Sequence, residues 1–168
     1  IEHYGVEPDI MTMAKGIADG FPLGAFIARA EIADAFTPGS HLSTFGGNPV
    51  SCAAALANIE VMKDEKLPEN SAVRGAQLMS AFKPLEDELA LVGEVRGRGL
   101  MIGLELVKDS DKTPAVAEAK EVKKRCREAG MLIGVGGSFA NVVRLQPPLV
   151  LTEDEGVQII DTLSKILR

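Results

Sequence analysis

The sequence of 168 residues is short of aromatic, basic and cysteine residues, and these shortages exclude several classes of function. Lys and Arg number 18 against 24 Asp and Glu, so the formal charge is −6, which argues against nucleic acid as the main partner. No apolar run approaches the roughly 20 residues that span a bilayer, so no membrane partner is expected. The first ten residues show no signal peptide. His3 and His41 have no second ligand at metal spacing, so no metal site is predicted.

The two cysteines, Cys52 and Cys126, are far apart in apolar segments of helical character. We interpret them as small buried side chains in a reducing compartment, which predicts a cytoplasmic protein. The first residue is Ile rather than Met, so we expect either processing or a piece of a longer chain.

Hydrophobic patterning and turn residues predict an α/β order of elements. Residues 9–14 are apolar on both faces, which is typical of a strand buried in a parallel sheet. This strand is expected to pair with strands that are absent from this sequence. The further expected elements are a strand over 24–28, helical turns before Pro38, a helix from Pro49 to about Asp64, a helix over 69–90 interrupted at Pro84, a strand pair over 91–106, a helix over 115–129, strands over 131–135 and 141–146, and a last helix that begins at a Thr152–Glu155 capping box.

Lys15 is the first candidate for chemistry. It stands at the carboxyl end of the strand over 9–14, the edge at which open α/β sheets bind ligands, and Gly16 leaves room beside it. A lysine amine in such a place is suited to Schiff-base chemistry. The alternative is an ordinary solvated surface charge.

Thr44 and Arg144 are two further candidates. Thr44 begins the segment TFGGN just before a helix N-terminus, which suggests an anion site, although a tight turn with an Asn48 N-cap explains it equally well. Arg144 is the one charge in the apolar strand VVRLQ. It either pairs with a structural carboxylate or holds a substrate carboxylate with its guanidinium group. The glycine-rich segments near residues 96 and 134 do not complete a dinucleotide-binding motif.

Four segments together resemble the C-terminal part of class III aminotransferases, the pyridoxal-phosphate family of ornithine, 4-aminobutyrate, acetylornithine and alanine–glyoxylate type 2 enzymes. The segments are PDIMTMAKGIADGFPLGAF, HLSTFGGNPVSCAAALA, VRGRGLMIGLEL and VVRLQPPLVLTEDE. The resemblance implies a fold-type I transferase of α/β class, in which the end of the large, mainly parallel-sheet domain is followed by a small α+β domain. The expected division is 1–66 for the large-domain part, 67–90 for a connecting helix and 91–168 for the small domain.

The resemblance also assigns roles to the three candidates. Lys15 would bind pyridoxal 5'-phosphate as a Schiff base and transfer the proton during transamination. Thr44 would bind the cofactor phosphate of the neighbouring subunit, which implies a homodimer with shared active sites. Arg144 would hold the carboxylate of the amino or 2-keto acid. The residues that support the pyridine nitrogen and the cofactor ring would lie before residue 1.

Two alternatives remain beside transamination. As part of a transaminase the chain is expected to be a fragment that is inactive alone. It could instead be a stand-alone, non-catalytic binding or interface module. It could also belong to a racemase or aminomutase that uses the same lysine and cofactor. The amine donor is expected to be an ω-amino acid or an alanine-like amine, with a 2-keto acid as acceptor.

Overall fold

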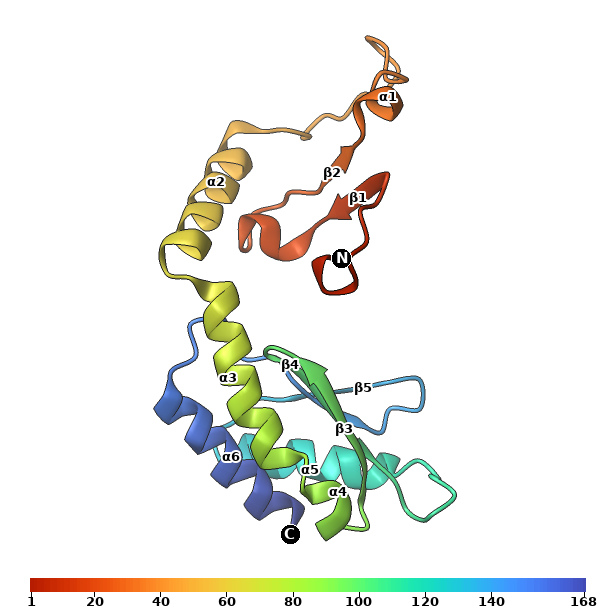
Figure 1. The fold of residues 1–168 in the computed structure, drawn as a ribbon, viewed down its shortest axis with the longest axis vertical. Coiled ribbons are helices and arrows are strands. Elements are labelled where there is room, and N and C mark those ends of the chain that lie inside the picture. The colour runs from red at the N-terminus through yellow and green to blue at the C-terminus, as the bar shows by residue number, and fades with distance from the viewer. The chain divides into compact units, whose positions relative to one another are not determined.

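The computed structural model describes all residues from 1 to 168, which form two compact units, Ile1–Glu65 and Lys66–Arg168 (Figure 1). Each unit is described by itself. No helix in either unit combines the length and the apolar character that crossing a membrane requires.

The first unit consists of short elements followed by one long helix. Its most buried side chains are small and lie where the long helix α2 packs against the 3-10 turn η2, namely Ala18, Ser51 and Ala55. The elements in chain order are η1 (Glu2–Tyr4), β1 (Ile10–Met13), η2 (Lys15–Ala18), β2 (Ala25–Ala28), α1 (Ala30–Ala33) and α2 (Pro49–Asp64).

The strand predicted over 9–14 is present as β1, but its surroundings differ from the prediction. It pairs with β2 in antiparallel register, Ile10 opposite Ala28 and Met13 opposite Ala25, and no parallel strand adjoins it in this chain. Its residues alternate between exposed and half-buried, so the expected burial on both faces is wrong within this chain. Apolar side chains on both faces of a strand indicate what the strand can pack against, and they do not supply the partner.

Helix α2 begins where the sequence predicts. Asn48 is the N-cap, and its side-chain oxygen accepts the amide of Ser51 at 2.9 Å, while Pro49 occupies the first helical position. Both features fix the direction in which the chain leaves the glycine turn at Gly46 and Gly47.

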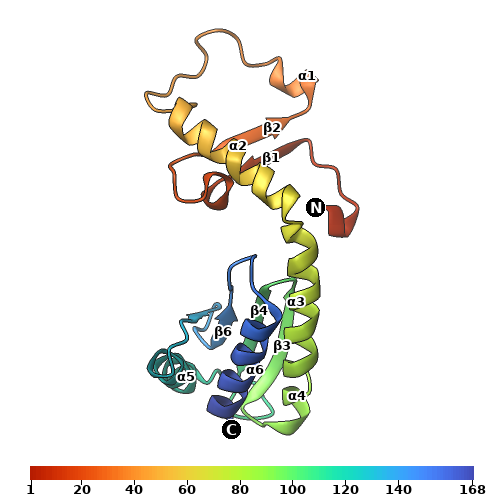
Figure 2. The same cartoon turned by 90° about the vertical axis from the view of Figure 1, so that its left-hand side faces the viewer.

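The second unit is a four-stranded antiparallel sheet covered on one face by helices (Figure 2). The strand order is β3-β4-β6-β5. The core between sheet and helices is apolar and includes Leu78, Phe82, Leu104, Val143 and Leu163. The elements are α3 (Leu67–Phe82), α4 (Leu85–Glu88), β3 (Val92–Arg98), β4 (Met101–Leu106), α5 (Val116–Glu128), β5 (Gly134–Gly136), β6 (Val142–Leu145) and α6 (Glu153–Leu167).

Helix boundaries in the second unit follow the predicted signals. The helix expected over 69–90 is two helices, because Pro84 separates α3 from α4, and both contact β3. Thr152 and Glu155 form the predicted capping box at the start of α6. Helices α3 and α6 run side by side (Figures 1 and 2), and Arg74 of α3 reaches Glu153 of α6 at 3.2 Å.

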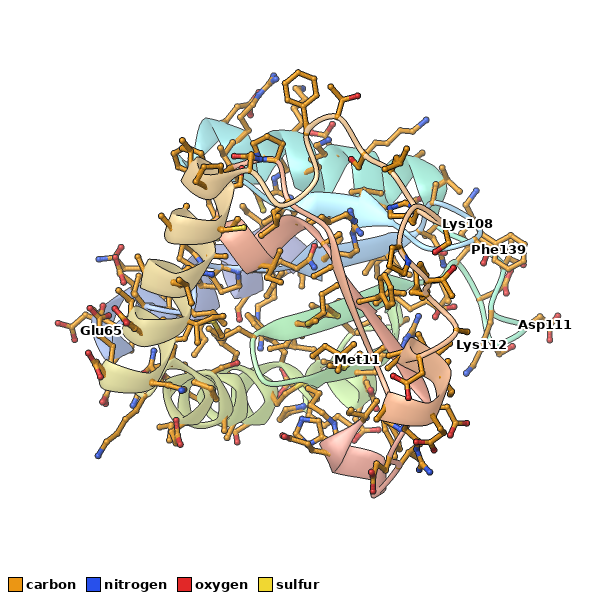
Figure 3. The ribbon with its side chains drawn as sticks, turned by 90° about the horizontal axis from the view of Figure 1, so that it is seen from above. Met11, Glu65, Lys108, Asp111, Lys112 and Phe139 are labelled. Atoms are coloured by element: carbon orange, nitrogen blue, oxygen red, sulfur yellow. The ribbon has the colours of Figure 1, made fainter.

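Loops at the edge of the second unit carry exposed side chains. Figure 3 shows Lys108, Asp111 and Lys112 in the loop between β4 and α5, and Phe139 in the turn between β5 and β6. The short strand β5 begins at Gly134 rather than at residue 131, as the sequence had suggested, and is therefore shifted toward that turn.

Candidate functional site

Lys15 follows the end of β1 directly and is the first residue of η2. Its backbone has φ 55°, in the left-handed region that L-residues other than glycine rarely adopt. The side chain is exposed, and its Nζ takes part in no hydrogen bond or ion pair. Lys15 therefore stands at the end of β1 with an uncommitted amine, although nothing in this chain removes that amine from water.

Thr44 lies in the turn that leads into α2. The Ser43 hydroxyl accepts the amide of Gly46 at 2.9 Å, and the Asn48 side chain donates to the carbonyl of Phe45 at 3.1 Å. These two bonds close the turn around Thr44, whose own side chain is exposed and has no hydrogen-bond partner. A hydroxyl in this position is free to donate to a ligand anion.

Arg144 lies on the open face of the four-stranded sheet, opposite the face that the helices cover. Its neighbours Val143 and Leu145 point into the core, while Arg144 itself is exposed. The guanidinium group forms no ion pair and no hydrogen bond within the chain. The alternative of a structural carboxylate partner in this chain is therefore wrong.

Two glycines of β5 make room for the Arg144 side chain. Gly134 is its direct cross-strand partner, and a Cβ atom added at Gly134 would lie 3.3 Å from Nε. A Cβ added at Gly136 would lie 3.1 Å from Nε and 3.3 Å from Cζ. The arginine thus rests on bare backbone, and any larger residue at either position would displace it. The glycine-rich segment near residue 134, which does not complete a dinucleotide-binding motif, therefore leaves room for the Arg144 side chain.

Arg96 shows what a structural arginine looks like on the same face. It pairs across the sheet with Gly103, which in turn pairs with Arg144. Its Nη1 lies 2.6 Å from a carboxylate oxygen of Glu94 and 2.6 Å from one of Glu105. These carboxylates raise the pKa of Arg96, chiefly through the hydrogen bond to Glu105. Two arginines in one row therefore differ in that only Arg144 has its charge available.

The three candidates are distributed over both units. Lys15 and Thr44 belong to the first unit, where no bond joins them, and Arg144 belongs to the second. No group of three His, Cys, Asp or Glu side chains could hold a metal ion. The free amine of Lys15 and the free hydroxyl of Thr44 suit a cofactor that carries an aldehyde and a phosphate.

The structure contains two pockets whose lining does not include Lys15, Thr44 or Arg144. One of about 540 Å³ in the first unit lies beside the turn before α2 and is lined by Phe21, Pro22, Phe45, Asn48, Val50 and Ser51. The other, of about 240 Å³, lies in the second unit and is lined by Ser71, Arg98, Leu100, Met101, Gln146, Pro147 and Leu149.

Comparison with known proteins defines the class. The mixed α/β structure resembles fold-type I pyridoxal-phosphate enzymes: an amine transaminase from an uncultivated Pseudomonas species, solved in its pyridoxal-phosphate-bound form, superposes with a TM-score of 0.88 at 39% identity, covering 99% of this chain and 39% of that one. The sequence model of the family "Aminotransferase class-III" matches residues 1–167. The chain therefore belongs to the class III aminotransferase family, whose cofactor is pyridoxal 5'-phosphate.

Two curated relatives show the range of the family. Alanine–glyoxylate aminotransferase 2 homolog 2 from Arabidopsis thaliana is 47% identical over 163 residues, which are 96% of this chain and 34% of the relative. A leucine/methionine racemase from Thermococcus litoralis is 42% identical over 165 residues, 96% of this chain and 37% of the relative. The chain thus spans between a third and two fifths of the length of these relatives.

Proposed function

We propose that the protein, as part of a longer chain, transfers an amino group from an amino donor to a 2-keto acid with pyridoxal 5'-phosphate as cofactor. The observation that carries this proposal is Lys15, an uncommitted amine at the end of β1 in a chain of class III aminotransferase sequence. Because the chain spans less than half of its relatives, the 168 residues alone are proposed to be inactive.

Lys15 is proposed to act through Nζ. Bound pyridoxal phosphate supplies an aldehyde and an aromatic ring that accepts electrons from the substrate carbon. Nζ would hold the cofactor through its aldehyde carbon, and as a free amine it would accept and return the proton at the substrate carbon. Its freedom from ion pairs leaves it available for both tasks.

Thr44 and Arg144 are proposed to bind the two anionic groups of the reaction. The Thr44 hydroxyl donates a hydrogen bond to the phosphate of the cofactor held by the partner protomer, which requires a homodimer. Arg144 binds the carboxylate of the amino or keto acid, since its guanidinium fork has no carboxylate of its own chain to satisfy it.

The remaining assignments rest on the family. We propose that residues 1–66 are the end of the cofactor-binding domain, that 67–90 connect it to a small domain over 91–168, and that the donor is an ω-amino acid or an alanine-like amine. The free thiols of Cys52 and Cys126 support a reducing compartment, proposed to be the cytoplasm.

Covalent labelling of Lys15 tests this function. The full-length protein is loaded with pyridoxal phosphate, reduced with borohydride and digested, and the modified peptide is identified by mass. We expect the label on the peptide that contains Lys15, and Lys15→Ala to lose both the label and at least about 10²-fold in turnover. Lys112→Ala is the matched control, because Lys112 also has a positive φ, of 60°, but lies in an exposed loop. A label on another peptide would contradict the proposal.

Racemisation is a second candidate, favoured by the 42% identity to the leucine/methionine racemase. It needs the same lysine and cofactor but no keto acid. Incubation of the holoenzyme with a single L-amino acid distinguishes the two: a racemase produces the D-amino acid, whereas a transaminase produces the keto acid and stops once the cofactor has accepted the amino group.

A further inference from the structure

Asn58 of helix α2 reaches across to the turn that carries Lys15. Its Nδ2 donates to the carbonyl of Gly16 at 2.8 Å and to that of Ile17 at 3.3 Å. These are the two residues that follow Lys15 in the chain, and they lie 42 and 41 positions away from Asn58. One side chain therefore ties two consecutive peptide groups of η2 to α2.

Few other bonds hold the turn. It is four residues long, its bond from the amide of Ile17 to the carbonyl of Ala14 is 3.4 Å, the amide of Phe21 donates to the carbonyl of Ala18 at 3.1 Å, and Ala18 is its single buried residue. The turn begins at Lys15 with a φ of 55°, a conformation that a residue with a Cβ keeps only where its surroundings impose it. The bonds from Asn58 are the side-chain hydrogen bonds to the two residues that follow Lys15.

Small residues on α2 bring the helix close enough for these bonds. Ser51 and Ala55 lie two turns and one turn before Asn58 on the same helical face and are 1% and 7% exposed. Helix α2 contacts η2, and small buried side chains on this face of α2 allow a short separation between the two elements. Asn58 is then fixed at a short reach from the two carbonyls.

We propose that Asn58 is a positioning residue for Lys15, which holds the peptide after the lysine so that Nζ is presented in one direction. This inference rests on the proposed function of Lys15. The Cα–Cβ bond is the point from which the flexible four-carbon stem of the lysine departs, so its direction limits the region that Nζ can reach. Proton transfer is sensitive to that direction, since a displacement of about 1 Å costs on the order of 10²-fold in rate.

The test compares Asn58→Asp with Asn70→Asp in the full-length protein. Aspartate has the shape of asparagine but donates nothing, and its charge repels the two carbonyls. Asn70 is the matched control, because its Nδ2 also donates to two carbonyls, those of Leu149 at 2.7 Å and Leu151 at 3.0 Å, in the second unit. Asn58→Gln, which keeps an amide donor on a longer stem, serves as the conservative variant.

The first measurement is hydrogen exchange in the cofactor-free protein. We expect the amides of residues 16–18 to exchange at least about tenfold faster in Asn58→Asp, to recover in part in Asn58→Gln, and to stay unchanged in Asn70→Asp. The second is steady-state kinetics of the holoenzyme. We expect kcat to fall between about tenfold and 10²-fold with KM for the donor within about twofold.

The outcomes separate this inference from the proposed function. Unchanged exchange at residues 16–18, or a loss of kcat equal to that of Asn70→Asp, overturns the role of Asn58 while labelling of Lys15 by borohydride still stands. Absence of the label at Lys15 in the wild-type protein overturns both. If Asn58→Asp fails to fold, Asn58→Gln and its exchange at the same amides decide the matter.

Discussion

At the scale of a single residue, the neighbours of Arg144 leave its guanidinium group available to a ligand. Its cross-strand neighbours Gly103 and Gly134 are glycines, whereas Arg96, two strands away in the same row, is paired with Glu94 and Glu105. A charge already paired twice is committed to the structure, and a charge without a partner retains its full attraction for a ligand.

Replacing Arg144 with alanine should therefore weaken carboxylate binding. We expect KM for the keto acid to rise by the equivalent of about 2–4 kcal/mol, with a smaller effect on kcat, because a charged bidentate contact is lost. Initial-rate kinetics of the full-length enzyme give the value. Arg96→Ala is the control and should leave KM unchanged. An unaltered KM in Arg144→Ala would remove Arg144 from the binding site.

Substitution of Gly136, which lies against the Arg144 side chain, should move the guanidinium group without removing it. In Gly136→Ala, the new Cβ would stand 3.1 Å from Nε, so the flexible guanidinium end moves rather than the backbone. We expect a severalfold rise in KM for the keto acid with little loss of stability. Gly103→Ala on the same face is the matched control, since its Cβ would meet a methyl group of Val142 at 3.0 Å. Equal KM values for both variants would show that Gly136 does not position the arginine.

The sequence predicted the apolar strand around Arg144 but not the surroundings of its side chain. Arg144 is the one charge in that strand, and the structure shows it exposed between the buried residues Val143 and Leu145. The support from Gly134 and Gly136 depends on the register of β5 with β6, which pairs Gly134 with Arg144 and Gly136 with Val142. Likewise, the sequence around Lys15 does not predict its left-handed φ or the hydrogen bonds from Asn58 to the two residues that follow it. Those bonds join segments that are about 40 residues apart.

Elements were predictable where a local signal marks their ends. Asn48 with Pro49, Pro84, and Thr152 with Glu155 each act within a few residues, and the structure confirms all three. Strand β1 is present as predicted, but its pairing with β2 carries no local signal, because it depends on residues farther along the chain. The predicted bounds of β5, 131–135, lie three residues too early at the start, because the glycines of Gly134–Gly136 add nothing to the hydrophobic pattern from which a strand is predicted.

The junction of α4 and β3 predicts a pH-dependent stability. The carboxylate of Glu86 accepts hydrogen bonds from Lys83 and from the amide of Val95, which lower the pKa of Glu86. A lowered pKa means that the folded state favours the ionised form, so the stabilisation is present above the ordinary value of 4.5 and disappears as pH falls through the lowered one.

Glu86→Gln should reveal that contribution. We expect the free energy of unfolding to fall by about 1 kcal/mol at pH 7, a modest figure because the carboxylate is partly exposed, and the difference to shrink toward zero as pH drops below 4.5. Urea unfolding of the full-length protein at several pH values measures it. Asp87→Asn, one position along, is the control, and a difference that does not depend on pH would contradict the assignment.

The whole molecule is proposed to act only as a pair, because Thr44 serves the cofactor of the partner protomer. Mixing Lys15→Ala and Thr44→Ala subunits tests this directly. If each site takes Lys15 from one protomer and Thr44 from the other, every mixed dimer contains one site with both changes and one intact site. Random exchange makes half of the dimers mixed, so activity should recover to about a quarter of the wild-type value.

The same mixture has a different outcome if Thr44 acts within its own protomer. Each mixed dimer would then hold one site without the lysine and one without the threonine, and activity would not exceed the mean of the two variants. Sedimentation of the wild-type protein supplies the second measurement, with a dimer expected. An active monomer would contradict the shared site, because no Thr44 from a partner would be present, while leaving the roles of Lys15 and Arg144 as they are.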